Sequence, residues 1–351
     1  MRALVTGGTG FVGSAVVREL LKEGFDVVCL VRLTSDLRNL LGLDVALAQG
    51  DLDDIASLRA AARGCQHLYH LAAYYSISAG DATRMFHTNV EGTRNVLTAA
   101  AEAGLVRIVH TSTIGTIGRP ATTSGPAGAR LPTEEDVFDE WETASPYVRS
   151  KLEAERLALE LAHQGAPIVV VDPCAPVGAR DIKPSSTGKR LIDYLSGRWP
   201  SFPPGGINFI AVEDVARGHL LAAQRGRIGE RYILGNADGN LVLKDFCALM
   251  ESVSGVRPPG RRTGRLGGAR TWPGATALRG IASRELHNLL GHDSTASQPA
   301  RGGYLPHALT ADPTRAICEL GLPQSPLDAA FHQAIDWFRA NGYVPAGQPR
   351  R

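Results

Sequence analysis

The first half of the chain alternates between short apolar runs and longer stretches with helical periodicity. Six runs rich in β-branched and aliphatic residues predict buried strands at Ala3–Thr6, Val27–Val31, Val45–Gln49, His67–Leu71, Val106–His110 and Ile168–Val171. Four amphipathic stretches predict helices at Phe11–Glu23, Ser57–Ala62, Met85–Ala103 and Tyr147–His163. Shortly beyond their ends stand glycines suited to a helix C-terminus, namely Gly24, Gly64, Gly104 and Gly165. This alternation predicts an α/β fold with a Rossmann-type doubly wound parallel sheet and helices on both faces.

The second half of the chain lacks this regular alternation. Helical patterns lie at Lys189–Gly197, Val215–Arg225, Leu243–Ser254 and Leu327–Ala340, and strand patterns at Asn208–Val212 and Glu230–Leu234. We expect residues 1–180 to form the doubly wound domain, with 208–225 returning to it, and 181–344 to form a smaller mixed C-terminal region. Long loops without structure are rare in compact domains, so the weakly periodic stretch 256–303 is expected to be a lid with some helix. Residues 345–351 are expected to be a frayed tail.

The composition is that of an ordinary globular protein. Of the 351 residues, 44% are hydrophobic and 21% are charged, which is enough apolar material for a sizeable core. The 37 basic side chains balance 35 acidic ones, so neither nucleic acid nor an anionic membrane is expected as a partner. No apolar run approaches the roughly 20 residues of a membrane helix. The strand pattern that begins at Ala3 leaves no room for a signal peptide.

The cysteines and histidines suggest neither disulfides nor a metal site. The five cysteines are Cys29, Cys65, Cys174, Cys247 and Cys318. Their scatter, without any C-x-x-C pair, indicates reduced thiols and therefore a cytoplasmic location. His67 and His70 are three positions apart on a predicted strand, so they point to opposite faces and make a poor metal pair. The acidic run at 134–136 is expected to be a solvated loop or helix start.

A glycine-rich turn separates the first strand from the first helix. Gly7, Gly10 and Gly13 have the spacing G-x-x-G-x-x-G. The first suits a tight turn, the second lets backbone approach a pyrophosphate, and the third lets helix and strand pack closely. The helix N-terminus supplies free N–H groups for phosphates, so we expect a dinucleotide here rather than a bare turn. Its predicted contacts in the turn are Gly7, Thr9, Gly10, Phe11, Val12 and Gly13.

The ends of the next strands bear on the choice of nucleotide. Arg32 stands at the end of the second strand, where an enzyme that prefers NAD usually has Asp or Glu for the ribose 2′-hydroxyl. Because a guanidinium matches a 2′-phosphate in charge and geometry, NADP(H) is favoured, while NAD(H) stays possible if this arginine is only a solvated loop residue. Asp51 and Leu52 are expected to face the adenine. The fourth strand is followed by Leu71, Ala72 and Ala73. We expect these small residues to let the backbone lie against the cofactor.

A tyrosine and a lysine mark the candidate chemistry. Tyr147 and Lys151 are four residues apart near the start of a predicted helix, so both project from one face. A nearby ammonium favours the phenolate, which would bring Tyr147 towards a useful acid–base range. Tyr147 could then give or take the proton on a substrate oxygen during hydride transfer, while Lys151 contacts the ribose hydroxyls. After the fifth strand we expect Thr113 to hydrogen-bond the reacting oxygen and Thr111 to line the cofactor.

Several short motifs lie in the order and spacing of one known family. They are the glycine turn, Asp51-Leu52, His70-Leu71-Ala72-Ala73, Asn89-Val90-Glu91-Gly92-Thr93, Thr111-Ser112-Thr113 and Tyr147-x-x-x-Lys151. Together they resemble the extended short-chain dehydrogenase/reductase family, the NAD-dependent epimerases and dehydratases, over about the first 180 residues. The resemblance implies a catalytic triad of Thr113, Tyr147 and Lys151, in which threonine replaces the commoner serine. It also implies that Asn89 supports the cofactor, that Pro173 and Val177 flank the nicotinamide carboxamide, and that helices 85–103 and 147–163 can pair in a homodimer.

Two further stretches are similar to one branch of that family. Residues 174–184 and 226–235 resemble hopanoid-associated sugar epimerases, which are near relatives of dihydroflavonol reductases. This resemblance implies hydride transfer at a carbinol or ketone carbon of a small molecule, as net reduction or as epimerisation. Asn208 and Phe209 stand where epimerases of nucleotide sugars commonly carry Arg-Asp. An alternative is a dinucleotide-sensing regulator without turnover, although such regulators typically lack the tyrosine or the lysine.

Overall fold

The large sheet consists of parallel strands that grow outwards from its centre. The computed structural model describes residues 1–76, 78–120, 130–139, 141–142, 144–259 and 308–344. The seven strands have the order β3-β2-β1-β4-β5-β6-β9. Their bounds are β1 Arg2–Thr6, β2 Asp26–Val31, β3 Ala46–Gln49, β4 His67–His70, β5 Arg107–Thr111, β6 Ile168–Pro173 and β9 Arg231–Leu234. The order reverses between β1 and β4, which confirms the doubly wound sheet and places the ligand crevice at the carboxyl ends of these two strands.

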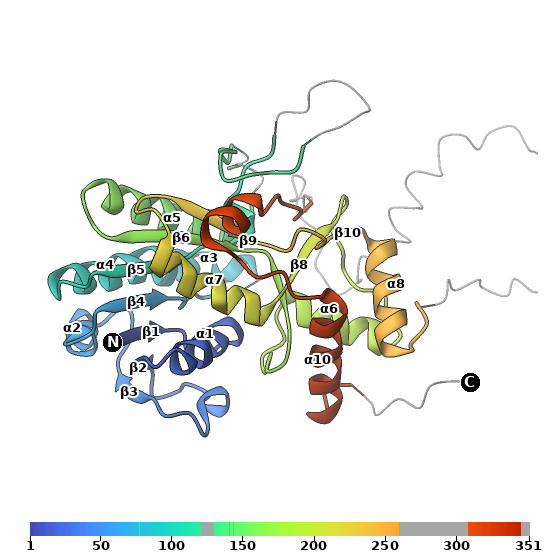
Figure 1. Ribbon diagram of the computed structural model, residues 1–351, viewed down its shortest axis with the longest axis horizontal. Coiled ribbons are helices and arrows are strands. Elements are labelled where there is room, and N and C mark those ends of the chain that lie inside the picture. Colours follow the sequence, from blue (N-terminus) through green and yellow to red (C-terminus); the bar gives the residue numbers. More distant parts are fainter. Residues whose placement is uncertain (77, 121–129, 140, 143, 260–307, 345–351) are drawn as a thin grey trace, which may run out of the picture.

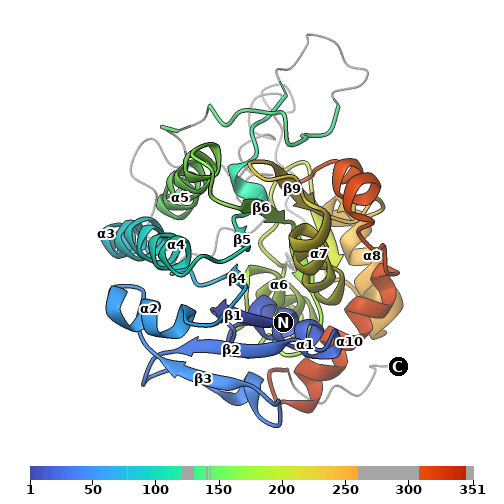
Figure 2. The same cartoon turned by 60° about the vertical axis from the view of Figure 1, so that its left-hand side comes forward.

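Helices cover both faces of this sheet, as Figures 1 and 2 show. On one face lie α1 (Phe11–Lys22) and α7 (Val212–Arg225), whose apolar sides share one core with the sheet. On the other face lie α2 (Ile55–Ala62), α4 (Gly92–Glu102) and α5 (Pro146–His163), which bury a second core. The helix ends follow local chemistry: Asp54 caps α2, and the four predicted glycines after these helices all have positive φ.

The segment before α4 is more complex than the single helix predicted at 85–103. A short 3-10 turn, η2 (Ala79–Asp81), leads into α3 (Ala82–Phe86), the π-helical turn η3 (His87–Glu91) and then α4. The helical run therefore begins before Met85 and contains an insertion that hydrophobic periodicity does not reveal.

Beyond β6, the described part of the chain also forms a smaller mixed sheet and four helices. The sheet has the order β10-β8-β7, with bounds β10 Asn240–Leu241, β8 Ile207–Ala211 and β7 Ala175–Val177. The helices are α6 (Ser186–Leu195), α8 (Leu243–Ser254), the π-helical η5 (Ala316–Leu320) and α10 (Leu327–Ala340). Two single turns, η1 (Arg38–Leu40) and η4 (Ile114–Thr116), lie near the large sheet. The third core joins this sheet to α6, α8 and α10 through stacked rings such as Phe209 and Phe246.

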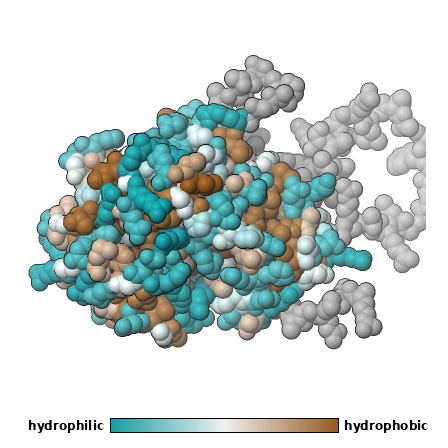
Figure 3. All heavy atoms as spheres, in the orientation of Figure 1, coloured by the Kyte–Doolittle hydropathy of each residue, from teal (hydrophilic) through white to brown (hydrophobic). Residues whose placement is uncertain are grey.

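Other predictions concern the cysteines, membrane-spanning helices, the lid and the C-terminal tail. All five cysteines are free, and only Cys318 is exposed. Within the described ranges, no helix combines the length and apolar composition needed to cross a bilayer. On the face shown in Figure 3, hydrophobic residues are interspersed among polar ones. Most of the predicted lid at 256–303 and all of the predicted tail at 345–351 lie outside the described residues.

Candidate active site

The glycine-rich turn joins β1 to α1 at the carboxyl edge of the large sheet. Gly7 has φ 73°, in the left-handed region, and a Cβ there would lie 2.7 Å from the backbone nitrogen of Ala72. A Cβ on Gly13 would overlap the carbonyl oxygen of Gly7. Any larger residue at either position would collide with backbone, so the tight turn and the close packing lie where the spacing predicts them.

The N-terminus of α1 presents free donors beside this turn. Gly10 is the N-cap residue, and no side chain in the described part of the chain caps the helix. The backbone N–H groups of Phe11, Val12 and Gly13 therefore lack intrahelical acceptors and form the positive end of the helix dipole. This arrangement suits the binding of a phosphate group.

A cavity of about 130 Å³ lies between this turn, the end of β2 and the segment after β7. It is lined by Thr9, Gly10, Phe11, Arg32, Thr34, Ser35, Asp36, Ile182 and Lys183. Arg32 follows β2 directly, and its guanidinium has no hydrogen-bond or ion-pair partner among the described residues. Arg38 pairs with Asp36 at 2.7 Å, and this contact lowers the pKa of the Asp36 carboxyl to about 2. Arg32 is thus available to a ligand, whereas Arg38 is already paired with Asp36.

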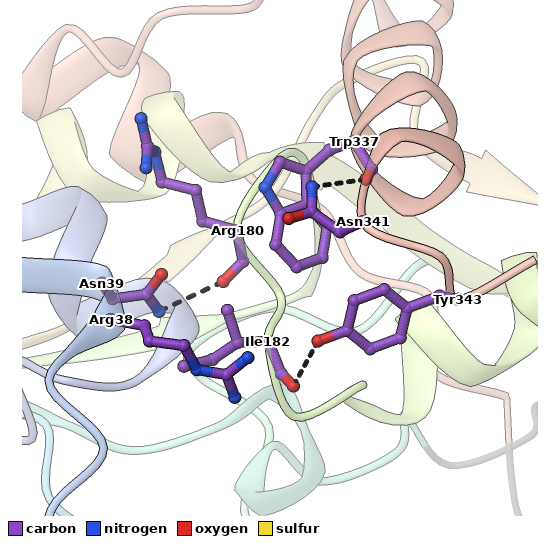
Figure 4. Close-up of a pocket in the computed structure, with 7 residues that line it drawn as sticks. All are labelled: Arg38, Asn39, Arg180, Ile182, Trp337, Asn341 and Tyr343. Atoms are coloured by element: carbon purple, nitrogen blue, oxygen red, sulfur yellow. Dashed lines mark hydrogen bonds between the residues drawn. The ribbon is translucent and has the colours of Figure 1, made fainter.

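A second cavity of about 160 Å³ lies beside the first, next to α10 (Figure 4). It is lined by Arg38, Asn39, Arg180, Ile182, Trp337, Asn341 and Tyr343. Arg180 has φ 75°, which is unusual for a residue with a side chain. The Tyr343 hydroxyl donates to the Ile182 carbonyl at 2.7 Å. Because Ile182 lines both cavities, the loop after β7 separates the crevice from the C-terminal helix.

Asn39 connects the glycine turn to this loop. Its side chain is buried, and its amide nitrogen donates to the carbonyls of Thr9 at 3.2 Å, Gly10 at 3.5 Å and Arg180 at 3.1 Å. The backbone carbonyl of Asn39 accepts from Arg18 Nη2 at 2.8 Å. One buried amide therefore fixes the position of the phosphate-binding turn relative to the strained Arg180.

The other predicted cofactor residues at strand ends lie along the same edge of the sheet. Asp51 and Leu52 follow β3, and Asp51 Oδ1 accepts from the Asp53 N–H at 3.3 Å. Leu71, Ala72 and Ala73 follow β4, where the Ala72 N–H donates to Thr6 Oγ1 at 3.3 Å.

Tyr147 and Lys151 lie one turn apart near the N-terminus of α5. Ser145 caps this helix by accepting from the Val148 N–H at 3.3 Å. The Tyr147 ring packs edge-on against Tyr75, with ring centroids 4.8 Å apart. Lys151 is only 3% exposed, and its Nζ donates to the Thr111 carbonyl at 2.6 Å. The lysine therefore binds α5 to the carboxyl end of β5.

Burial dominates the protonation of both side chains. It raises the pKa of the Tyr147 phenol above its ordinary value, and the neighbouring Tyr75 raises it further. Burial also lowers the pKa of Lys151 to about 8, although the carboxyl groups of Glu155 and Asp172 act in the opposite direction. The expectation that the ammonium brings the pKa of Tyr147 down is not met, because burial and the neighbouring Tyr75 raise it. At neutral pH the phenol is protonated and the lysine is mostly charged.

The hydroxyl residues after β5 turn in different directions. Thr111 Oγ1 hydrogen-bonds His219 Nε2 on α7 at 3.0 Å. Ser112 Oγ donates to Glu155 Oε2 at 2.5 Å. Thr113 Oγ1 accepts from the Gly115 N–H at 3.3 Å. In the described part of the chain, Thr113 differs from the other two because only its hydroxyl oxygen is hydrogen-bonded. Its hydroxyl hydrogen is therefore free to donate.

The remaining predicted residues are buried around the site. Asn89 lies in η3 and bonds both the N–H and the carbonyl of Tyr74, at 2.7 and 3.0 Å, and Ser150 Oγ at 2.9 Å. Asn89 therefore ties the loop after β4 to α5. Pro173 ends β6 and Val177 ends β7, and both are buried.

Comparison with known proteins decides the family. Residues 3–235 match the NAD dependent epimerase/dehydratase family. The chain belongs to this family. Its fold is a seven-stranded Rossmann-type sheet with a smaller mixed sheet.

Its relatives within the family include reductases. The chain is 38% identical over 346 residues to a putative dihydroflavonol 4-reductase from Synechocystis sp., which covers 97% of this chain and 95% of the relative. It is 34% identical to sterol demethylase protein B from Methylococcus capsulatus, over 98% of this chain and all of the relative. The crystal structure of gox2253 is 35% identical and superposes with a TM-score of 0.79 over 98% of this chain and 99% of the other. The chain is therefore an oxidoreductase or epimerase of the short-chain dehydrogenase/reductase type.

The sequence did not identify Asn39, Glu155 or His219 as parts of the candidate active site. Asn39 and His219 reach it from segments far along the chain, and no local pattern marks them. Glu155 extends the spacing of Tyr147 and Lys151 by another four residues, which is the signal that could have found it.

The Asn39 contacts can be tested by Asn39→Asp. An aspartate cannot donate to the three carbonyls and places a charge among them, so we expect a loss of about 1–3 kcal/mol in the free energy of unfolding at neutral pH. Asn95→Asp is the control, because the Asn95 amide donates to one carbonyl only, that of Leu52, from a half-buried position. Urea unfolding measures both, and equal losses would contradict the special position of Asn39.

Proposed function

We propose that the chain is an NADP(H)-dependent oxidoreductase that transfers hydride at a carbinol or ketone carbon, with Thr113, Tyr147 and Lys151 at the reacting centre. The observation that carries the proposal is the contact of Lys151 with the Thr111 carbonyl, 2.6 Å long. This contact sets the helix face that bears Tyr147 against the strand end that bears Thr113. The same edge of the sheet carries the glycine turn, so phenol, hydroxyl and crevice share one side of the molecule.

The crevice suits a dinucleotide. Gly7 and Gly13 leave a cradle that any Cβ would fill, and α1 presents uncapped N–H groups for a diphosphate. Arg32, whose guanidinium has no partner among the described residues, directly follows β2 and suits a 2′-phosphate. The Asp36 carboxylate lines the same cavity but is paired with Arg38. The bound cofactor would supply the hydride. Asp51 and Leu52 would lie near the adenine, and Pro173 and Val177 near the nicotinamide.

The three site residues have separate roles. Tyr147, protonated because it is buried, donates its proton to the substrate oxygen. Thr113 donates its free hydroxyl hydrogen to the same oxygen and so orients the substrate. Lys151 provides a positive charge one helical turn from the phenol, which stabilises the phenolate once the proton has left.

Net reduction is favoured over epimerisation of a nucleotide sugar. Asn208 and Phe209 are fully buried, and the Asn208 amide donates to the Asn236 carbonyl at 2.8 Å. Neither side chain is available to bind a diphosphate. A resting phenol that is protonated is also the form needed to reduce a ketone. The names of the relatives from Synechocystis sp. and Methylococcus capsulatus support small molecules such as flavonoids or steroids.

The rest of the chain is assigned by the same proposal. Residues 1–180 bind the cofactor, residues 208–225 return to that domain, and residues 181–344 bind the substrate. A homodimer would form through helices of the 85–103 and 147–163 segments.

The role of Tyr147 is tested by Tyr147→Phe. Loss of the hydroxyl should leave the affinity for NADPH unchanged and lower turnover by at least ~10²-fold, the scale of a positioned acid. The assay follows NADPH oxidation with a dihydroflavonol, a 3-ketosteroid and a 4-keto nucleotide sugar as probes. Tyr75→Phe is the control, because it removes a hydroxyl from the ring that packs on Tyr147. Full activity of Tyr147→Phe would remove this residue from the mechanism.

The preference for NADP(H) is tested by Arg32→Ala. Removing a charge-assisted contact to a 2′-phosphate should weaken NADPH binding by about tenfold or more and leave NADH binding nearly unchanged. Arg227→Ala, at an exposed arginine paired with Glu319, controls for the loss of one positive charge. Dissociation constants for both nucleotides decide the point, and equal losses would leave the NADP(H) assignment without support.

Reduction and epimerisation are separated by the need for added cofactor. A reductase forms product only with stoichiometric NADPH, and this is the outcome we expect with the ketone probes. Incubation of UDP-glucose without added cofactor should give no inversion. Its conversion to UDP-galactose under those conditions would establish epimerisation instead.

A further inference from the structure

The face of α5 that carries Tyr147 and Lys151 continues one turn further to Glu155. This side chain is 2% exposed, and its Oε2 accepts from Ser112 Oγ at 2.5 Å and Thr116 Oγ1 at 2.6 Å. Lys151 donates to the carbonyl of Thr111, the residue before Ser112. One helix face thus binds consecutive residues of the chain immediately before Thr113.

A second buried acid lies behind Glu155. Asp172, on β6, accepts from Thr116 Oγ1 at 3.3 Å, and its other oxygen has no partner among the described residues. Burial, followed by the neighbouring Glu155, raises the pKa of Asp172 well above its usual range. Arg231 Nη1 donates to Glu155 Oε1 at 2.9 Å. Glu155 thus pairs with Arg231 through Oε1, and its carboxyl group acts on Lys151 more than that of Asp172 does.

We propose that Glu155 is a positioning residue of the active site: its carboxylate fixes Ser112 and Thr116 on the two sides of Thr113, and its charge stabilises the ammonium of Lys151. This inference rests on the proposed function for the roles of Thr113 and Lys151. Without Glu155, Ser112 and Thr116 lose a buried acceptor, and Lys151 loses a carboxylate of its own helix that favours its charged form.

The ionisable groups around this centre come from several elements. The carboxyl groups of Asp172 on β6 and Glu155 on α5 itself act on Lys151. Lys151 in turn acts on His70 on β4 and His110 on β5. Burial lowers the pKa of His70 to about 3 and that of His110 well below its usual range, so both are neutral. The two acids also face Arg231 on β9, the Glu134 carboxyl and the buried Cys174 thiol. Burial raises the pKa of both Glu134 and Cys174. Glu155 is therefore the group whose charge has most effect on Lys151.

The test measures the protonation of Lys151 directly, without a substrate. The protein has few lysines, namely Lys22, Lys151, Lys183, Lys189 and Lys244. Labelling lysine with ¹³C at Cε gives one NMR signal for each, and Lys151→Met identifies the signal of interest. The full chain should show a midpoint near pH 8 for this signal.

The decisive variant is Glu155→Gln combined with Asp172→Asn, because Asp172 can ionise in place of a missing Glu155. We expect the Lys151 midpoint to fall by about one to two pH units, the effect of losing one nearby opposite charge. Ser112→Ala should leave the midpoint unchanged, since it removes no charge, and Asp172→Asn alone should lower it less than the double variant, since Glu155 remains. An unchanged midpoint in the double variant would overturn the proposal.

Failure to fold does not leave the question open. If the double variant unfolds because Arg231 is left unpaired, adding Arg231→Gln removes both partners of the buried ion pair, and the same fall is expected. The result is also separable from the proposed function: full activity of Tyr147→Phe would end that proposal without altering the NMR midpoint.

Discussion

The contact between α5 and the end of β5 is the interaction on which the site depends. Lys151 donates to the Thr111 carbonyl and Glu155 accepts from the Ser112 hydroxyl, so two side chains of one helix face bind the last residue of β5 and the residue directly after it. A hydrogen bond to a charged group is stronger than a neutral one, and burial increases the cost of breaking it. The position of Thr113 relative to Tyr147 follows from these two contacts rather than from any direct contact between the two residues.

A second constraint lies on the cofactor side of the same crevice. Asn39 joins the glycine turn to the loop around Arg180, and that loop leads into α6 and the smaller sheet. Because the Asn39 amide satisfies carbonyls from both segments, a displacement of the turn is transmitted to the loop. Asn39 thus connects the glycine turn to the chain segment that continues into the smaller sheet, by polar contacts.

The parts of this arrangement that could be predicted are those encoded by local spacing. The glycine turn and the pair Tyr147 and Lys151 follow from backbone sterics and from helical periodicity, which act over a few residues. The strands β7 and β10, of three and two residues, are too short for any period to show. The expectation of a solvated acidic run at 134–136 is wrong for Glu134 and Asp136, which are buried. Glu134 accepts from the Ile233 N–H, and distant Arg231 donates to its carbonyl. Contacts between distant segments leave no local trace in a sequence.

The groups behind the phenol suit the direction of proton transfer in the proposed mechanism. Glu155, which pairs with Arg231, and Asp172 both favour the charged form of Lys151, whose pKa burial lowers to about 8. Burial keeps the phenol neutral before reaction, when no negative charge needs stabilising. In the proposed mechanism, the phenolate left after proton transfer to the substrate would be stabilised by the Lys151 ammonium, and a low dielectric constant makes such an attraction stronger. The same burial that raises the pKa of Tyr147 at rest would therefore strengthen the interaction that stabilises the phenolate after the transfer.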